Sequence, residues 1–146
     1  MITDAYSFIA LQRKTRFIFE SEGKQGKIIK IIQFTQLESN EWNLGFGDLK
    51  DGNIDDLIIS NNEDVFKVIK TVAKVVTIFF QEYPQSRFII KPIDDKRKKL
   101  YNSIFRRHFK DIILDFNILG IVENNKEAYS PQKNYDNFEI TLKFEL

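Results

Sequence analysis

The stretch from Arg87 to Lys110 concentrates cationic side chains in one part of the chain. It carries nine basic residues against two acidic residues, Asp94 and Asp95, although the net charge of the whole chain is only +1. Charges segregated in this way create a local field that the net charge conceals, and such a field attracts carboxylates or phosphates. The candidate ligand- or partner-binding residues of this stretch are Lys96, Arg97, Lys99, Arg106 and Arg107.

Three uses of the basic stretch are open. It could bind the phosphates of a nucleic acid, dock a protein partner, or be a solvated helix face. Aromatic residues alternate with the cations, but Tyr101, Phe105 and Phe109 recur at the spacing of a buried helix stripe. They are therefore not arranged as a platform for stacking bases. We expect a protein partner or a homo-oligomer, with nucleic acid as a third alternative.

A second cluster of charge, of opposite sign, precedes the basic one. From Glu38 to Asp64 there are eight acidic residues and a single basic residue, Lys50. The carboxylates, with Asn61 and Asn62 as neutral oxygen donors, are the ligand types that Mg²⁺ and Ca²⁺ prefer. Their spacing does not match an EF-hand, however, and Asp, Asn and Gly are also the residues of turns and helix N-caps. We therefore expect turns and a cap, no metal site, and Asn61 and Asn62 as candidate ligand contacts.

Residues suited to catalysis are few. Cysteine is absent, which excludes disulfides, thiolate zinc sites and thiol nucleophiles. The one histidine, His108, would need Asp111 or Asp115 to orient it as a base, and a surface histidine is the favoured interpretation. No nucleophile elbow, phosphate-binding loop or dinucleotide fingerprint is present. The sequence favours a protein without catalysis and without a cofactor.

The first half of the chain predicts strands followed by a helix. Segments 16–21 and 27–36 are β-branched and aromatic, are separated by a Gly-containing turn, and predict a hairpin. A third strand is expected over 42–49 and a short fourth over 56–60. The run from Val65 to Tyr83 contains no Gly or Pro, follows the capping residues Asn62-Glu63-Asp64, and predicts a largely buried helix.

The second half repeats this alternation. A strand is expected over 87–93, and Asp94-Asp95 predicts the cap of a basic helix over 96–109. Segment 110–120 continues as helix and then strand, and 137–145 alternates as a closing strand. The order predicts an α+β fold, β-β-β-α-β-α-β-β, with a mostly antiparallel sheet and two main helices packed on it. The residues expected in its core are Phe66, Ile69, Val72, Val76, Phe80, Phe88, Ile90, Leu100, Ile104 and Phe105.

Length and composition indicate one soluble domain. At 146 residues the chain has the size of a single domain, and no linker or repeat divides it, so we expect one domain over 1–146. The N-terminus lacks the basic and apolar regions of a signal peptide, and no apolar run reaches the length of a membrane span. We expect a cytoplasmic protein with no membrane association.

Several motifs resemble those of an uncharacterised family of small Bacteroidota proteins. They are W-N-L-G-F-G-D-L at 42–49, I-D-D at 54–56, S-N-N-E-D at 60–64 with K-V after it, and the basic segment ending in L-Y at Leu100-Tyr101. The similarity covers about residues 16–120. This sequence departs from the family pattern at Glu63, where the family has Gly, and over 91–96. The resemblance implies a bacterial protein and a shared fold, but it implies no activity.

The order of elements is similar to that of the acyl-CoA N-acyltransferase fold. In that family a Tyr on the later helix often acts as the general acid, and Tyr101 occupies the corresponding place. The family's Gln/Arg-x-x-Gly-x-Gly/Ala motif, which binds the CoA pyrophosphate at the start of the first helix, is missing. The matching segment contains no Gly and is flanked by Asp55, Asp56, Glu63 and Asp64, which would repel a pyrophosphate. The resemblance therefore implies an acyltransferase-like topology and, at most, a degenerate enzyme that uses Tyr101.

The function that the sequence favours is binding. We expect a small intracellular interaction protein, such as a regulatory protein or one component of a defence module, that uses its basic helix. An acyltransferase-like enzyme is the alternative, and weak nucleic-acid binding through the basic helix is the third possibility.

Overall fold

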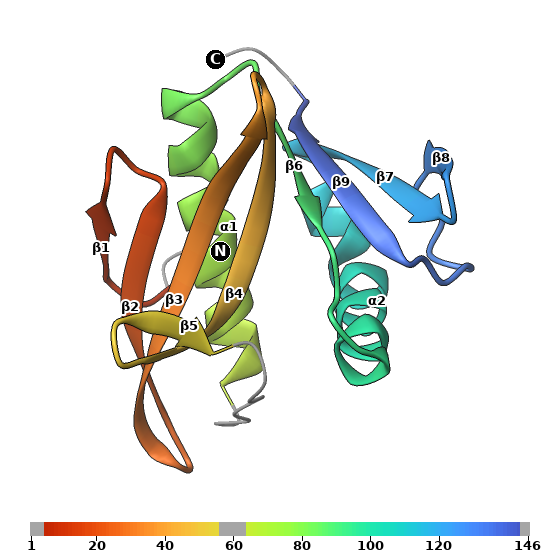
Figure 1. Ribbon diagram of the computed structural model, residues 1–146. Helices are drawn as coiled ribbons and strands as arrows, with labels where there is room; N and C mark the ends of the chain where they lie inside the picture. The colour runs from red at the N-terminus through yellow and green to blue at the C-terminus, as the bar shows by residue number, and fades with distance from the viewer. Residues whose placement is uncertain (1–4, 56–63, 144–146) are drawn as a thin grey trace. The chain divides into compact units, whose positions relative to one another are not determined.

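The computed structural model describes residues 5–55 and 64–143, and it contains two long helices and nine strands (Figure 1). The elements in the first half of the chain are β1 (Phe8–Leu11), β2 (Arg16–Gly23), β3 (Gly26–Glu38), β4 (Glu41–Lys50), β5 (Asn53–Asp55) and α1 (Val65–Glu82). Those in the second half are β6 (Arg87–Ile90), α2 (Asp95–Ile112), β7 (Phe116–Val122), β8 (Asn125–Ala128) and β9 (Asn137–Leu142).

The strands hydrogen-bond in the order β1-β2-β3-β4-β6-β9-β7-β8, with β5 paired to β4. The sheet is mostly antiparallel, and β6 runs parallel to β4 over three residue pairs, from Glu41 with Arg87 to Asn43 with Ile89. The α+β class and the mostly antiparallel sheet predicted from the sequence are confirmed, and the predicted order of strands and helices roughly matches the observed order.

The chain divides into two compact units. The first comprises Met1–Thr35 and Gly45–Tyr83, and the second comprises Gln36–Leu44 and Pro84–Leu146. Each unit has its own helix, α1 in the first and α2 in the second. The single domain over 1–146 stays a prediction.

Aromatic rings form the core of the first unit. Phe17 and Phe19 of β2 lie on one face of the sheet, because alternate residues of a strand point the same way, and both are buried. Phe34 of β3 stacks on Phe79 of α1 with ring centroids 3.9 Å apart. Helix α1 therefore packs on the face of the sheet that these phenylalanines occupy.

The buried face of α1 is displaced from the face expected. Its buried residues are Thr71, Val75, Val76, Phe79 and Phe80. The expectation was wrong for Phe66, which is 59% exposed. Burial is confirmed for Val76, Phe80, Phe88 and Phe105. The remaining predicted core residues are half-buried: Ile69, Val72, Ile90, Leu100 and Ile104.

Polar contacts explain this displacement. The Thr71 hydroxyl accepts a hydrogen bond from the backbone N–H of Tyr6 at 2.8 Å, and Thr71 is fully buried. Asp64, at the N-cap position of α1, makes no side-chain capping bond. Its carboxylate instead accepts hydrogen bonds from the hydroxyls of Tyr6 and Ser21, each at 2.5 Å. These bonds fix one side of a helix that is apolar on several sides.

A buried ion pair joins β3 to β4. The ammonium of Lys30 donates a hydrogen bond to the carboxylate of Asp48, and each side chain is only 6% exposed. The Lys30 ammonium also lies 6.0 Å from the centre of the Phe46 ring. Removing two charges from water costs several kcal/mol per ion, so each of these charges depends on the other.

Several strand boundaries predicted from the sequence differ from those in the structure. The fourth strand expected over 56–60 lies outside the described residues, and the strand that precedes it is β5. The strand expected over 87–93 ends at Ile90. The short strand β8 was not predicted, and the sequence of the N-terminal dozen residues, which contain β1, is compatible with either a short strand or a loop. Neither strand shows clear alternation of apolar and polar residues.

The buried pair of the first unit gives a stability prediction. Lys30→Met leaves the Asp48 carboxylate buried without a partner, so we expect it to lower the free energy of unfolding by about 3–5 kcal/mol. Lys30→Met/Asp48→Leu removes both charges and should cost less than the single substitution. Urea unfolding monitored by circular dichroism measures both values.

Lys27→Met is the matched control, because Lys27 lies near the start of the same strand and pairs with Glu22 on the surface, at 3.7 Å. An exposed pair contributes little, so this variant should unfold almost as the parent does. Equal losses in the Lys30→Met single and double variants would show that the two buried charges are not coupled.

Candidate functional site

Helix α2 carries most of the candidate site residues, and local sequence determines where it begins. Asp94 has an extended backbone, and its carboxylate accepts a hydrogen bond from the backbone N–H of Arg97 at 2.8 Å. Asp95 in the first turn and Lys110 in the last turn complement the helix dipole. The cap predicted at Asp94-Asp95 is confirmed, and the helix extends three residues beyond Phe109, to Ile112.

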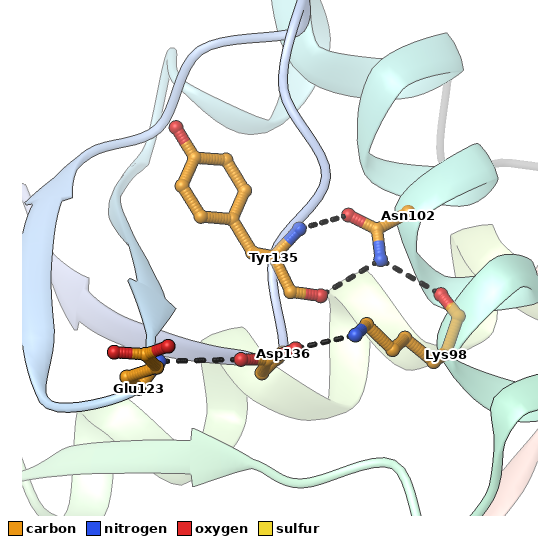
Figure 2. A network of polar contacts seen from close by, with 5 residues as sticks. All are labelled: Lys98, Asn102, Glu123, Tyr135 and Asp136. Carbon is orange, nitrogen blue, oxygen red and sulfur yellow. Dashed lines mark hydrogen bonds and ion pairs between the residues drawn. The ribbon is translucent and has the colours of Figure 1, made fainter.

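An amide side chain attaches α2 to the segment that leads into β9, as Figure 2 shows. The Asn102 side chain is buried; it accepts a hydrogen bond from the Tyr135 N–H at 2.8 Å and donates one to the Tyr135 carbonyl at 2.9 Å. Asn102 also donates to the carbonyl of Lys98, 2.8 Å away. The amide thus pairs with the backbone of Tyr135 much as a residue of a neighbouring strand would, and it fixes the rotation of α2.

Charged side chains extend this network. Lys98 donates a hydrogen bond to Asp136, and Asp136 accepts a second bond from the Glu123 N–H at 3.2 Å (Figure 2). These contacts lower the pKa of the Asp136 carboxyl, the bond from Lys98 contributing most. Arg106 donates to the Pro131 carbonyl at 2.9 Å and to the Asn134 side chain at 2.7 Å.

Aromatic packing completes the attachment of α2. Phe105 stacks on Phe138 of β9 with ring centroids 4.3 Å apart. Tyr135 is fully buried, and its ring lies against Gly120 of β7 so closely that a Cβ at Gly120 would be 2.3 Å from the ring. Position 120 therefore requires glycine because of this close approach.

The structure separates the five cations proposed from the sequence into two groups. Lys96, Lys99 and Arg107 are exposed. Arg106 is exposed too, but it is bonded to the 131–134 loop as described above. Arg97 differs from the expectation of a solvent-facing cation: it is only 5% exposed, and its guanidinium donates to Asp94 at 2.6 Å. The Arg97 side chain thus lies buried, bonded to the N-cap residue of its own helix.

The exposed cations form a row along α2. Successive residues of a helix are about 100° apart, so Lys96, Lys99, Arg107 and Lys110 fall within about 80° of one another. We call these four residues the basic stripe. Within residues 5–55 and 64–143, none of the four makes an ion pair or a side-chain hydrogen bond. Exposed apolar residues lie just beyond the two ends of α2: Ile93 is 54% exposed and Leu114 is 66% exposed.

The other proposed residues lie elsewhere. Tyr101 is half-buried on α2. His108 is half-buried as well; burial lowers its pKa from 6.5, Arg107 lowers it further, and Asp111 acts in the opposite direction. Asn61 and Asn62 lie outside the described residues.

The acidic cluster of the sequence is not assembled into a site within the described residues. Asp48 is paired with Lys30, and Asp64 accepts bonds from Tyr6 and Ser21. Across residues 5–55 and 64–143, no three His, Cys, Asp or Glu side chains come together as metal ligands. Neither α1 nor α2, the helices of this same part of the chain, has the length and hydropathy needed to cross a membrane.

The fold and a match to a protein family together define the class of this protein. The chain has an α+β fold with a mostly antiparallel sheet, and a family model matches residues 3–143. The chain belongs to this family, DUF6934, which is described as a family of unknown function. None of the curated proteins matches the chain, and none of the solved structures does.

The amide contact predicts that Asn102→Ala destabilises the fold. It leaves the N–H and the carbonyl of Tyr135 buried without these partners, so we expect a loss on the order of 2–4 kcal/mol. Ser103→Ala, at the next position of the same helix, is the control and should change stability little. Urea unfolding of both variants tests this; an equal, small effect in the two would show that the amide does not anchor α2.

The pKa of His108 predicts how stability depends on pH. Because folding lowers this pKa from 6.5, the unfolded chain binds the proton more readily. The contribution of His108 to stability is therefore complete above pH 6.5 and is lost as the pH falls below it. Urea midpoints measured between neutral and mildly acidic pH should fall in the parent chain and fall less in His108→Gln. Identical profiles would contradict the prediction.

Proposed function

We propose that the chain is a binding protein that docks an acidic segment of a protein partner on the basic stripe of α2. The proposal rests on the basic stripe, because its four exposed cations make no ion pair or side-chain hydrogen bond within the part of the chain described. Cations that stabilised the fold would be paired internally, as Lys98 and Arg106 are. A cytoplasmic location, which the cysteine-free composition favours, belongs to the same proposal.

Ile93 and Leu114 favour a protein partner over a nucleic acid. A phosphate backbone is bound by charge and needs no apolar contact outside its path. A protein interface combines charged contacts with a few apolar anchors that become buried. The 18 residues of α2 span about 27 Å. The fitting partner segment thus has carboxylates along about that length and an apolar side chain towards each end.

A designed peptide tests this proposal. The probe is a fluorescein-labelled helical peptide with Glu residues along one face and Leu near both ends, and fluorescence anisotropy measures its dissociation constant. We expect Lys99→Glu/Arg107→Glu to weaken binding by about tenfold or more, equivalent to about 1.4 kcal/mol or more. Leu114→Ala should weaken it without changing its salt dependence.

Lys27→Glu/Lys50→Glu is the matched control, because it changes the net charge equally at two exposed lysines of the first unit. Affinity that falls as much in this control as in the stripe variant would mean that net charge, not the stripe, attracts the peptide. Single-stranded DNA is the competing probe, and its affinity should stay in the range of nonspecific contacts, about 10⁻⁴–10⁻⁶ M. Tighter binding of DNA than of the peptide would replace protein docking with nucleic-acid binding.

A second candidate function, an acyltransferase-like enzyme, is supported by topology. The elements follow the order β-β-β-α-β-α-β-β expected for it, apart from the short additional strands, and α1 connects β4 and β5 to β6, which runs parallel to β4. Tyr101 on α2 would be its general acid. The acidic, glycine-free segment before α1 argues against a bound pyrophosphate. Calorimetry with acetyl-CoA decides: we expect no binding, and micromolar binding would make the enzyme the leading candidate.

A further inference from the structure

The two strands at the ends of the strand order differ in how their free edges are protected. An edge strand exposes unpaired backbone groups, and proteins commonly place charged residues there to prevent pairing with another chain. At one end β8 contains Lys126 and Glu127. At the other end β1 has the sequence Phe-Ile-Ala-Leu and carries no charge. β1 pairs with β2 on one side, and no strand of the described ranges pairs with its other side.

The side chains of β1 add an apolar surface to this edge. Phe8 and Ala10 lie opposite Phe19 and Phe17, on the face of the sheet that α1 covers. Ile9 and Leu11 therefore point to the other face, where they are 63% and 40% exposed. Ile29 of β3 shares this face and is 39% exposed. The short strand β1 thus offers both an unpaired backbone edge and an apolar face to a binding partner.

The turn that follows β1 holds the strand in place at a conformational cost. Gln12, Arg13 and Lys14 all have positive φ, at 50°, 57° and 62°, a conformation that L-residues with a Cβ disfavour. Two contacts from the end of α1 hold this turn. The Tyr83 hydroxyl donates to the Arg13 carbonyl at 2.8 Å, and Lys14 lies 3.8 Å from Glu82. The edge is therefore preformed and needs no rearrangement before it pairs.

We propose that β1 pairs antiparallel with β1 of a second copy of this chain, so that two sheets join at this edge. Residues directly opposite each other in an antiparallel pair lie on the same face of the sheet. Ile9 can therefore lie opposite Leu11 of the second copy, but not opposite its Ala10. The register that pairs Ile9 with Leu11 in both directions places the two-fold axis at Ala10, which faces its own equivalent.

Charge and symmetry favour a second copy over an unrelated strand. A two-fold interface must be complementary to itself, and an uncharged strand meets this condition without like-charge repulsion. In the antiparallel register the basic turns with Arg13 and Lys14 lie at opposite ends of the paired strands. A parallel arrangement would bring them side by side. Because β1 is only four residues long, the interface is small, so we expect a weak, concentration-dependent dimer.

Disulfide trapping tests this register directly, because the chain contains no cysteine. Two residues that face each other across an antiparallel pair fall within the Cα–Cα range of disulfides, about 4.4–6.8 Å. We expect Ala10→Cys to form a covalent dimer under mild oxidation. Ala128→Cys is the matched control: it replaces an exposed alanine in the opposite edge strand, β8, and should stay mostly monomeric. Non-reducing gel electrophoresis measures both.

A second variant separates pairing from random collision. Ile9→Lys places a charge at the proposed interface, so it should reduce trapping in the Ile9→Lys/Ala10→Cys chain to the level of the control. Circular dichroism verifies that the variant is folded, and sedimentation velocity of the unmodified chain should show a dimer that dissociates on dilution. Equal trapping at positions 10 and 128, or a monomer at every concentration, would overturn the proposal. Neither outcome bears on the basic stripe, which the peptide titration tests independently.

Discussion

The pairing of the Asn102 amide with the backbone of Tyr135 is the contact on which the exposure of the basic stripe depends. Helix α2 has few buried residues, namely Arg97, Asn102 and Phe105, so apolar burial alone defines its rotation poorly. Asn102 bonds both the backbone N–H and the backbone carbonyl of one residue, Tyr135, and only one rotation of the helix provides them. A turn of one residue, about 100°, would bring Ser103 to this place and move the stripe away from solvent. The exposure of the four cations therefore follows from a single buried amide.

In the first unit, too, polar contacts determine the orientation of the helix, although α1 is apolar where α2 is basic. Helix α1 has apolar side chains on several sides, so burial favours more than one orientation of it. Its orientation is selected by polar groups, the Thr71 hydroxyl and the Asp64 carboxylate, which bind Tyr6 and Ser21. Stacking of Phe34 on Phe79 then packs the selected face of α1 against the sheet. In both units, polar contacts that span many residues of sequence decide which helix face becomes the inner one.

The difference between local patterns and contacts that are distant in sequence explains what could be predicted from the sequence. Both long helices, the cap at Asp94 and the main strands follow from local periodicity and capping residues, and these predictions were confirmed. The exposure of Phe66 and the anchoring role of Asn102 were not predicted, because each depends on residues far away in the sequence. Asn102 and Tyr135, for example, are 33 positions apart. The burial of Arg97 was not predicted either, although its partner Asp94 is only three positions away. One missed signal was readable: Lys30 interrupts the apolar run Ile28-Ile29-Lys30-Ile31-Ile32, where a buried cation needs a carboxylate.

The ion pairs of the second unit support the binding role proposed for the basic stripe. In the second unit Arg87, Lys98, Lys126 and Lys133 are each paired with a carboxylate. The four cations of the basic stripe, which make no ion pair with the described residues, lie together on α2, where their fields add instead of cancelling. Exposed ion pairs contribute little to stability, so the fold loses little by leaving these side chains unpaired. An incoming carboxylate would meet several cations on a helix that is already fixed in position, and most of the ordering cost of that encounter would fall on the partner.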